Sequence, residues 1–170
     1  TIKTQTDRLT RLSEDLLLLT NGDEANGERE SVDLGSLAAE VVRQLEPMAA
    51  TRSVTLNVVC PQPVEVMTSP DLMYRCVLNL VDNAIKYSGD GSTVTVTVGR
   101  SGGNATIAVA DNGAGIDAES LPRVFDRFYR VDKGRSRREG GTGLGLAIVK
   151  QDVESLGGKV SAESEVGKGT

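Results

Sequence analysis

The sequence predicts an α/β sandwich, in which helices cover one face of a sheet. Two kinds of segment predict it. Some carry apolar residues at three- and four-residue spacing, which is the period of a helix, and others alternate apolar and polar residues, which is typical of strands. Helical segments and hairpin strands fall into separate groups along the chain. Such grouping favours a sheet with helices packed on one side.

One long helix is expected at the start of the chain, over residues 1–20. Four leucines recur there at three- and four-residue spacing among charged residues: Leu9, Leu12, Leu16 and Leu19. They form an apolar seam, and a seam before a polar break favours pairing with another helix, as in a dimeric bundle. Packing on the chain's own domain is the alternative. Residues 21–30, NGDEANGERE, are polar and acidic and predict a linker.

The remaining elements follow from the same periods and from turn signals. Further helices are expected at residues 34–50, 71–87 and 144–156. Ser69 is expected to cap the second of these, with Pro70 at its first position, and two glycines at residues 157–158 end the third. Strands are expected at residues 31–33, 53–59, 64–68, 93–98, 105–110 and 159–163. A Ser-Gly-Gly-Asn turn joins the fourth and fifth strands into a hairpin.

Composition limits the chemistry of the chain. It has 170 residues, of which 38% are hydrophobic, enough for one buried domain with an appendage, and no apolar run approaches the ~20 residues that cross a bilayer. There is no histidine, which excludes a histidine-dependent triad, histidine zinc ligands and a phosphohistidine within these residues. Cys60 and Cys76 lack a metal-binding spacing. We expect both to be free thiols, at a strand end and in a helix core respectively, in a reducing compartment.

A glycine-rich segment, GGTGLGLAIVK at residues 140–150, runs directly into a helical pattern. Backbone without side chains can approach a phosphate closely, and the following helix offers free N–H groups; a flexible hinge is the alternative. Neither the GxGxxG nor the GxxxxGK[ST] fingerprint is present, which disfavours a Rossmann or P-loop protein. Residues 121–150 hold eight basic and three acidic side chains, a local charge of +5, whereas the whole chain has −5. This contrast favours a bound polyanion over general affinity for nucleic acid.

Two further groups of polar residues suggest ligand binding. Asn79, Asn83 and Lys86 share one face of a mostly apolar helix. An amide oxygen there suits a hard Mg²⁺ ion whose other ligands are water and the phosphates of a substrate. The alternative for each asparagine is that its side chain caps or bridges nearby backbone. Asp111 closes a strand before two glycines and either forms a simple turn or accepts a hydrogen bond from the exocyclic amino group of adenine.

Five motifs stand in order along the chain. They are NLVDNAIKY from Asn79, DNGAG from Asp111, FDRFYR from Phe125, GTGLG from Gly141 and GKGT from Gly167. On these motifs the chain closely resembles the catalytic ATP-binding domain of sensor histidine kinases, a member of the GHKL superfamily shared with DNA gyrase, Hsp90-type chaperones and mismatch-repair ATPases. The resemblance covers residues 31–170. It implies a Bergerat-type fold, a mixed and mostly antiparallel sheet under about three helices. Residues 1–20 resemble the second helix of the dimerisation and phosphotransfer hairpin.

The resemblance also implies roles for single residues. Asn83 would bind Mg²⁺ with Asn79 beside it, and Lys86 and Arg130 would contact phosphate oxygens and serve catalysis. Asp111 would bind adenine with Gly115 and Thr170. Residues 132–140 would form a lid. The other implied nucleotide contacts are Tyr87, Gly113, Ile116, Tyr129, Gly141, Thr142, Gly143, Leu144, Gly145 and Leu146.

As a function, the resemblance implies that the chain binds ATP and Mg²⁺ and donates the γ-phosphoryl group to a histidine in two-component signal transduction. That histidine, on the helix before residue 1, and a final strand after Thr170 are expected to lie outside these residues. The expected partners are a phosphoacceptor hairpin of its own or a partner kinase chain, a response regulator and, in the intact protein, a second copy, but neither nucleic acid nor membrane. Cytoplasmic placement is expected, with any inner-membrane anchor elsewhere.

Two alternatives remain. One is a nucleotide-binding module without catalysis, which the five intact motifs disfavour. The other is a serine-directed anti-sigma-factor kinase of the same superfamily, which lacks the phosphoacceptor hairpin. The leucine seam at the start of the chain disfavours this second alternative.

Overall fold

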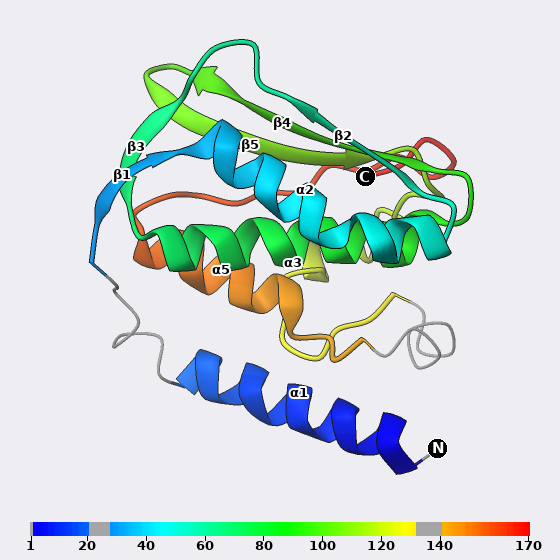
Figure 1. Ribbon diagram of the computed structural model, residues 1–170. Coiled ribbons are helices and arrows are strands. Elements are labelled where there is room, and N and C mark those ends of the chain that lie inside the picture. Colours follow the sequence, from blue (N-terminus) through cyan, green and yellow to red (C-terminus); the bar gives the residue numbers. More distant parts are fainter. Residues whose placement is uncertain (1, 21–27, 132–140) are drawn as a thin grey trace.

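The computed structural model describes residues 2–20, 28–131 and 141–170, and its elements lie in layers (Figure 1). The helices are α1 (Ile2–Thr20), α2 (Leu34–Thr51), α3 (Pro70–Ser88) and α5 (Gly145–Ser155), with a short 3-10 helix, η1, at Leu121–Arg123. The strands are β1 (Glu30–Asp33), β2 (Thr55–Val59), β3 (Glu65–Thr68), β4 (Thr93–Ser101) and β5 (Asn104–Asp111). The strands lie on one side of α2 and α3, and α5 and then α1 follow on the other side.

The strands pair in a mixed, mostly antiparallel pattern. β2 pairs with β4 in parallel, β4 pairs with β5 antiparallel, and β1 and β3 form a separate antiparallel pair. Alternate residues of β4 explain its place at the centre of the three-stranded sheet, because Val94, Val96 and Val98 are all buried beneath the helices. The predicted α/β sandwich with a mixed sheet is confirmed.

The helices begin where the sequence provides caps. Oδ1 of Asp33 accepts hydrogen bonds from the backbone N–H groups of Gly35 and Ser36 at the start of α2. The predicted cap of α3 is confirmed, because Oγ of Ser69 accepts a hydrogen bond from Leu72 N at 3.4 Å. α2 and α3 then bury apolar faces against the sheet, forming a core that includes Leu34, Val41, Leu45, Val77, Val81 and Ile85. α3 therefore joins the sheet to α5, which packs on its other side.

Both cysteines are free, as predicted. Cys76 is buried in α3, and Cys60 follows β2, where its thiol donates a hydrogen bond to the carbonyl oxygen of Gln62.

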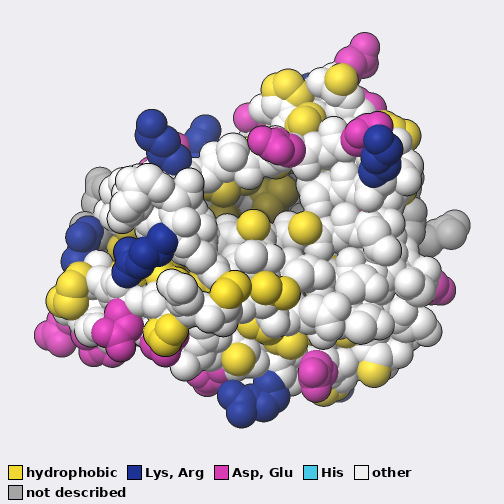
Figure 2. Space-filling view, turned by 90° about the horizontal axis from the view of Figure 1, so that it is seen from above, with side chains coloured by type: hydrophobic (Ala, Val, Ile, Leu, Met, Phe, Trp, Pro, Cys, Tyr) yellow, Lys and Arg dark blue, Asp and Glu magenta, His cyan; other side chains and the backbone are white. Residues whose placement is uncertain are grey.

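Among the described residues, no helix is long and apolar enough to cross a membrane. Seen from above, the sheet side carries few charged side chains at its centre, and Lys, Arg, Asp and Glu gather mostly toward its rim (Figure 2).

One predicted strand is wrong. Residues 159–163 join no strand pair, although the expected alternation is present, with Val160 and Ala162 half-buried between exposed neighbours. An alternating pattern indicates that one side of an extended segment is buried. A segment that lies on the protein surface can bury one side in this way without pairing with another strand. The nearest pairing is an isolated bridge between Glu165 and Gly169.

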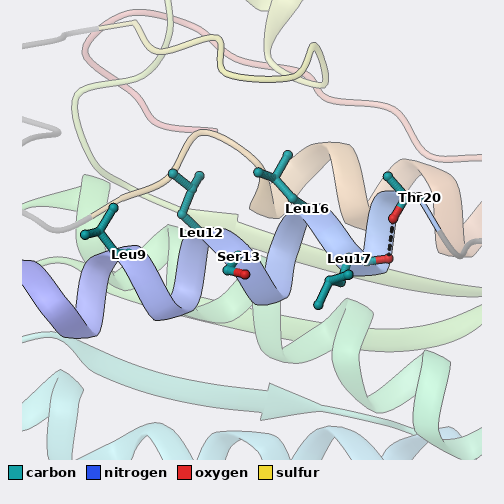
Figure 3. Close-up of a pocket in the computed structure, with 6 residues that line it drawn as sticks. All are labelled: Leu9, Leu12, Ser13, Leu16, Leu17 and Thr20. Atoms are coloured by element: carbon teal, nitrogen blue, oxygen red, sulfur yellow. Dashed lines mark hydrogen bonds between the residues drawn. The ribbon is translucent and has the colours of Figure 1, made fainter.

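The leucine seam of α1 is divided between two environments. Leu19, with Leu12 and Leu18, packs on Leu144, Ala147 and Ile148 at the start of α5, so part of the seam covers the chain's own domain. Leu9 and Leu16 of the seam, together with Leu17 beside it, line an open groove of 390 Å³ along α1, in which Leu9 and Leu17 are 66% and 57% exposed (Figure 3). Most of the predicted linker, residues 21–27, lies outside the described residues.

Candidate functional site

Asp111 lies at the end of β5, where the second and last of the five motifs meet. Its backbone N–H donates a hydrogen bond to the carbonyl oxygen of Thr170 at 2.8 Å, and its Oδ1 accepts one from Gly113 N at 2.9 Å. The carboxylate is half-buried and therefore retains access to a ligand. The structure thus brings together Asp111 and Thr170, which the family resemblance assigns to one adenine site.

Two glycines allow three chain segments to meet beside Asp111. A Cβ atom on Gly113 would lie 2.5 Å from the carbonyl oxygen of Ser88, at the end of α3. A Cβ atom on Gly169 would lie 1.9 Å from the carbonyl oxygen of Asp111. Both distances are far below a normal contact, so only glycine permits these approaches. The loop after β5 is consequently fixed against the end of α3 and against the end of the chain.

Ser164 is a supporting residue that the sequence analysis did not identify. Its hydroxyl accepts a hydrogen bond from Ile116 N at 2.7 Å and donates one to the carbonyl oxygen of Gly169 at 2.8 Å. It also lies 2.9 Å from Oγ1 of Thr170. A lone serine outside the motifs gives no sequence signal of such a role. It holds two predicted nucleotide contacts, Ile116 and Thr170, in fixed relation.

The polar face of α3 carries the predicted metal and phosphate contacts. Asn79, Asn83 and Tyr87 are half-buried, and within the described part of the chain the amides of the two asparagines make no hydrogen bond to another residue. The ammonium group of Lys86 pairs with Oδ2 of Asp82 at 2.8 Å. Asp82 lies inside the NLVDNAIKY motif, although the motif alone did not indicate a role for it. The lysine can provide a positive charge and the accessible amides N–H donors to an anionic ligand, and the amide oxygens can bind a cation.

The oxygen atoms that α3 offers fit a Mg²⁺ ion that is bound mainly by water and by the phosphates of a ligand. Among the described residues, no group of three or more Asp, Glu, Cys or His side chains is placed to hold a metal ion. The half-buried amide of Asn83, which has no partner among those residues, provides a neutral oxygen ligand. Mg²⁺ suits such a site because it keeps several waters and is commonly bound through one or two protein oxygens and substrate phosphates.

Residues 141–145, here called the glycine segment, lie between the FDRFYR motif and α1. Phe128 N donates a hydrogen bond to the carbonyl oxygen of Gly143 at 2.9 Å, and Gly143 has a φ of +77°. On the other side, the hydroxyl of Thr142 donates to Oδ2 of Asp15 at 2.9 Å. The segment ends in Gly145, the first residue of α5, so the free N–H groups of that helix start here. This geometry suits a phosphate group.

Asp15 links α1 to the same region, although no pattern in the sequence indicates this contact. Burial raises the pKa of its carboxyl above the usual value, although the hydrogen bond from Thr142 and the charges of Arg11 and Lys86 act in the opposite direction. The charge of Lys86, on α3, is the smallest of these effects on Asp15. A carboxylate of α1, a lysine of α3 and a threonine of the glycine segment therefore occupy one neighbourhood.

Some predicted contacts have side chains occupied elsewhere. Leu144 is fully buried in the cluster with α1, and Leu146 is half-buried. The hydroxyl of Tyr129 donates a hydrogen bond to Oγ of Ser120, and the Arg123 guanidinium lies over its ring at 4.4 Å. Arg130 and Gly115 are half-buried. The predicted lid, residues 132–140, lies outside the described residues.

Comparison with known families agrees with this geometry. The sequence profile of the family described as "Histidine kinase-, DNA gyrase B-, and HSP90-like ATPase" matches residues 68–170, which is more than half of the chain. The chain belongs to this family. The matched residues include all five motifs, from the helix that carries Asn79 to Thr170. The predicted relationship to the catalytic domain of sensor histidine kinases is confirmed.

Relatives of this histidine kinase-like ATPase chain include sensor kinases. The sensor-like histidine kinase SenX3 of Mycolicibacterium smegmatis is 39% identical over 88% of this chain. The mycobacterial sensor histidine kinase MprB has a solved structure that is 32% identical, with a TM-score of 0.65 over 76% of this chain and 80% of that chain. Full-length ShkA, solved in complex with AMPPNP, is 27% identical, with a TM-score of 0.83 over 96% of this chain. The chain spans 39% of the length of SenX3 and 34% of ShkA.

Proposed function

We propose that this chain binds Mg-ATP and donates the γ-phosphoryl group to a histidine on a phosphotransfer helix in two-component signalling. One observation carries the proposal: α3 is contacted at its end by the Asp111 loop and along its length by α5, which starts from the glycine segment. A candidate adenine acceptor and a candidate phosphate cradle therefore lie against one helix that carries Asn79, Asn83 and Lys86. Membership in an ATPase family supports the same ligand.

Each group has a chemical task in this proposal. The Asp111 carboxylate accepts the exocyclic N–H of adenine, with Thr170 beside it. The Asn83 amide holds Mg²⁺ with Asn79 nearby, and Lys86 and Arg130 balance phosphate charge. When bound, Mg²⁺ neutralises charge that develops on the phosphates. The N–H groups at the start of α5 donate hydrogen bonds to phosphate oxygens. Phosphoryl transfer relies mainly on positioning and charge neutralisation, so a site without an activated nucleophile suffices.

The acceptor and the partners come from outside these residues. The chain has no histidine, so the phosphoacceptor belongs to a hairpin of the intact protein or of a partner kinase chain. In the proposed organisation, residues 1–20 are part of the dimerisation and phosphotransfer hairpin, residues 21–30 are a linker and residues 31–170 belong to the catalytic domain. The exposed leucine groove of α1 faces a second copy in the intact homodimer. A cytoplasmic response regulator then receives the phosphoryl group.

A two-step experiment tests this function. The chain is titrated with a fluorescent ATP analogue with and without Mg²⁺, and is then mixed with ATP and a separate hairpin that carries either a histidine or a serine acceptor. We expect Mg²⁺-dependent binding and slow labelling of the histidine hairpin alone, because transfer between separate molecules loses the effective concentration of a tether. Binding without any transfer would favour a non-catalytic nucleotide module. Labelling of the serine hairpin would favour a serine-directed kinase.

A further inference from the structure

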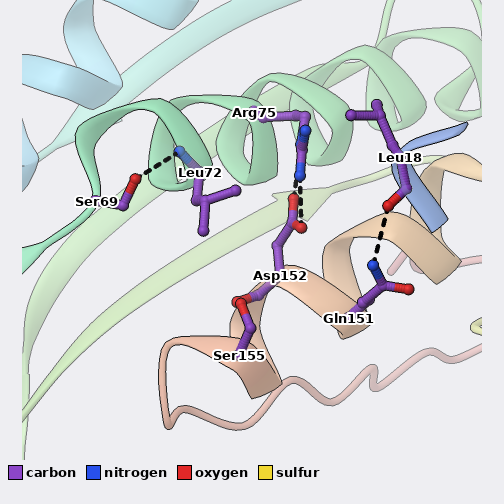
Figure 4. A network of polar contacts seen from close by, with 7 residues as sticks. All are labelled: Leu18, Ser69, Leu72, Arg75, Gln151, Asp152 and Ser155. Atoms are coloured by element: carbon purple, nitrogen blue, oxygen red, sulfur yellow. Dashed lines mark hydrogen bonds and ion pairs between the residues drawn. The ribbon is translucent and has the colours of Figure 1, made fainter. Parts of the chain in front are cut away.

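Arg75 of α3 and Asp152 of α5 form a two-point ion pair between the helices (Figure 4). Nε of Arg75 lies 2.7 Å from Oδ2 of Asp152, and its Nη2 lies 2.6 Å from Oδ1. The Asp152 side chain is 4% exposed and that of Arg75 is 23% exposed. Two parallel hydrogen bonds from a planar guanidinium fix both the distance and the direction of the carboxylate.

The carboxylate end of this pair is buried. Cys76, the neighbour of Arg75, is 2% exposed, and burial together with the charge of Asp152 raises the pKa of its thiol to about 12. A carboxylate at such a place is strongly destabilising without its cation. The same contact with apolar side chains would hold the helices together but would not fix their register through directed bonds.

The pair lies at the opposite end of the α3–α5 contact from the glycine segment. The two helices run in opposite directions side by side (Figure 1). Asn83 lies eight residues after Arg75 on α3, and Gly145 lies seven residues before Asp152 on α5, so both are about 10–12 Å along their helices from the pair. Arg75, Asn79 and Lys86 also share one face of α3. A tilt of α5 at the pair therefore changes the separation of Gly145 from Asn83.

Gln151, next to Asp152, contacts the opposite neighbour. Its Nε2 donates a hydrogen bond to the carbonyl oxygen of Leu18 in α1 at 3.1 Å (Figure 4). Adjacent residues of α5 thus contact α3 on one side and α1 on the other. The Ser155 hydroxyl donates to the carbonyl oxygen of Asp152 and secures the last turn of the helix.

We propose that the Arg75–Asp152 pair is a positioning device, which sets the distance between the glycine segment and the Asn79–Lys86 face of α3 and so adjusts the site to a triphosphate. This inference rests on the proposed function. Arg75 and Asp152 act through α5 and touch no nucleotide. The adenine contact at Asp111 lies on β5 and the loop after it, so the pair affects phosphate binding and leaves adenine binding alone.

The test measures the preference of the chain for ATP over adenosine by calorimetry, together with thermal unfolding. Asp152→Asn removes the charge but keeps the shape of the side chain. We expect it to weaken ATP binding on the order of tenfold or more, with adenosine binding nearly unchanged, because small misplacements of positioned groups have effects of this size. The parent chain provides the reference for both ligands.

Two further variants separate positioning from stability. The double variant Arg75→Met with Asp152→Leu replaces the pair by apolar side chains, which commonly recovers stability and keeps the test usable if Asp152→Asn fails to fold. It is expected to regain the unfolding temperature but not the preference for ATP. Val98→Ala serves as a destabilised control, because Val98 is fully buried in β4 and lies on neither α3 nor α5. It is four residues from Val94, which pairs with Asp111.

The outcomes are distinct. A preference for ATP that follows the unfolding temperature across all variants, including Val98→Ala, would overturn the positioning role. So would an apolar double variant that regains both quantities. A parent chain that binds neither ATP nor adenosine would overturn the proposed function, and with it this inference.

Discussion

The hydroxyl of Thr142 donates a hydrogen bond to Oδ2 of Asp15, joining the glycine segment to α1 across 127 positions of sequence. The same hydroxyl accepts a hydrogen bond from Leu144 N at 3.3 Å, so it shapes the start of α5. Lys86 lies near enough to lower the pKa of Asp15, although burial raises it overall. A carboxylate of α1 therefore occupies the region in which the proposed function places phosphates.

Asp15→Asn is expected to tighten ATP binding. Removal of a negative charge near the bound phosphates removes a repulsion of about 1 kcal/mol, and an amide still accepts the hydrogen bond from Thr142. Calorimetric titration of the parent and the variant measures the difference. Asp7→Asn, which changes an exposed carboxylate of the same helix, is the control. Equal effects of the two substitutions would show that Asp15 is not near the phosphates.

The raised pKa of Asp15 predicts a pH-dependent stability. Burial makes the folded state bind the proton more tightly than the unfolded state. Stability therefore falls as pH rises from about 4, the ordinary pKa of an aspartate, through the raised folded-state pKa. Relative to the parent, Asp15→Asn is expected to gain stability at neutral pH and to lose this advantage below about pH 3, in urea unfolding followed at several pH values.

Asp117 provides a control of opposite sign for this measurement. Hydrogen bonds from the backbone N–H and the hydroxyl of Ser120 lower the pKa of its carboxyl. Its contribution to stability is present above the ordinary aspartate pKa and is lost as pH falls through the lowered value. Asp117→Asn should therefore lose stability at neutral pH and approach the parent in acid. A common direction for both variants would contradict the assigned shifts.

Local signals in the sequence predicted most of the fold. The Ser69 cap and the alternating residues of β4 were identified because each depends on a few neighbouring residues. The prediction of a strand at residues 159–163 was wrong, because an alternating pattern indicates burial on one side of a segment and not pairing with another strand. Pairs such as Arg75–Asp152 and Asp15–Thr142 join residues 77 and 127 positions apart, and no spacing pattern indicates them. The motifs thus located the site, whereas the contacts that orient it required the fold.

Asp111→Asn is expected to weaken adenine-nucleotide binding by about 1–3 kcal/mol, because an amide in place of the carboxylate mispairs or leaves a donor unmatched. The preference for ATP over GTP should fall with it. Calorimetric titration with both nucleotides measures these changes. Asp126→Asn is the control, since its carboxylate is exposed and pairs with Arg123 on the surface. Unchanged affinity and unchanged preference would remove Asp111 from the adenine site.

Asn83→Ala is expected to abolish most of the Mg²⁺-dependent part of ATP binding. The helix should remain folded because alanine has the higher helix propensity, and Asn83 is only half-buried. Binding without Mg²⁺ should change little. Titrations with and without Mg²⁺ measure both quantities. A variant with the Mg²⁺ dependence of the parent would transfer the metal to another residue, with Asn79 as the next candidate.

The chain alone is expected to remain unlabelled after incubation with γ-labelled ATP and Mg²⁺. It contains no histidine, so it cannot form a phosphohistidine even when the nucleotide site is occupied. With a separate histidine hairpin as acceptor, Arg130→Ala should slow transfer more than it weakens ATP binding. The reason is that a cation aimed at the transferring group stabilises charge that develops in the transition state.

Two measurements decide this last prediction. The ATP affinity of the Arg130→Ala variant is obtained by titration, and the rate of hairpin labelling is measured at saturating ATP, so that binding and transfer are separated. Arg127→Ala, which alters an exposed arginine of the same motif, is the control. Equal losses of affinity and transfer would make Arg130 a general phosphate contact. Stable labelling of the chain without a hairpin would point instead to a serine or aspartate acceptor and would contradict the proposed histidine transfer.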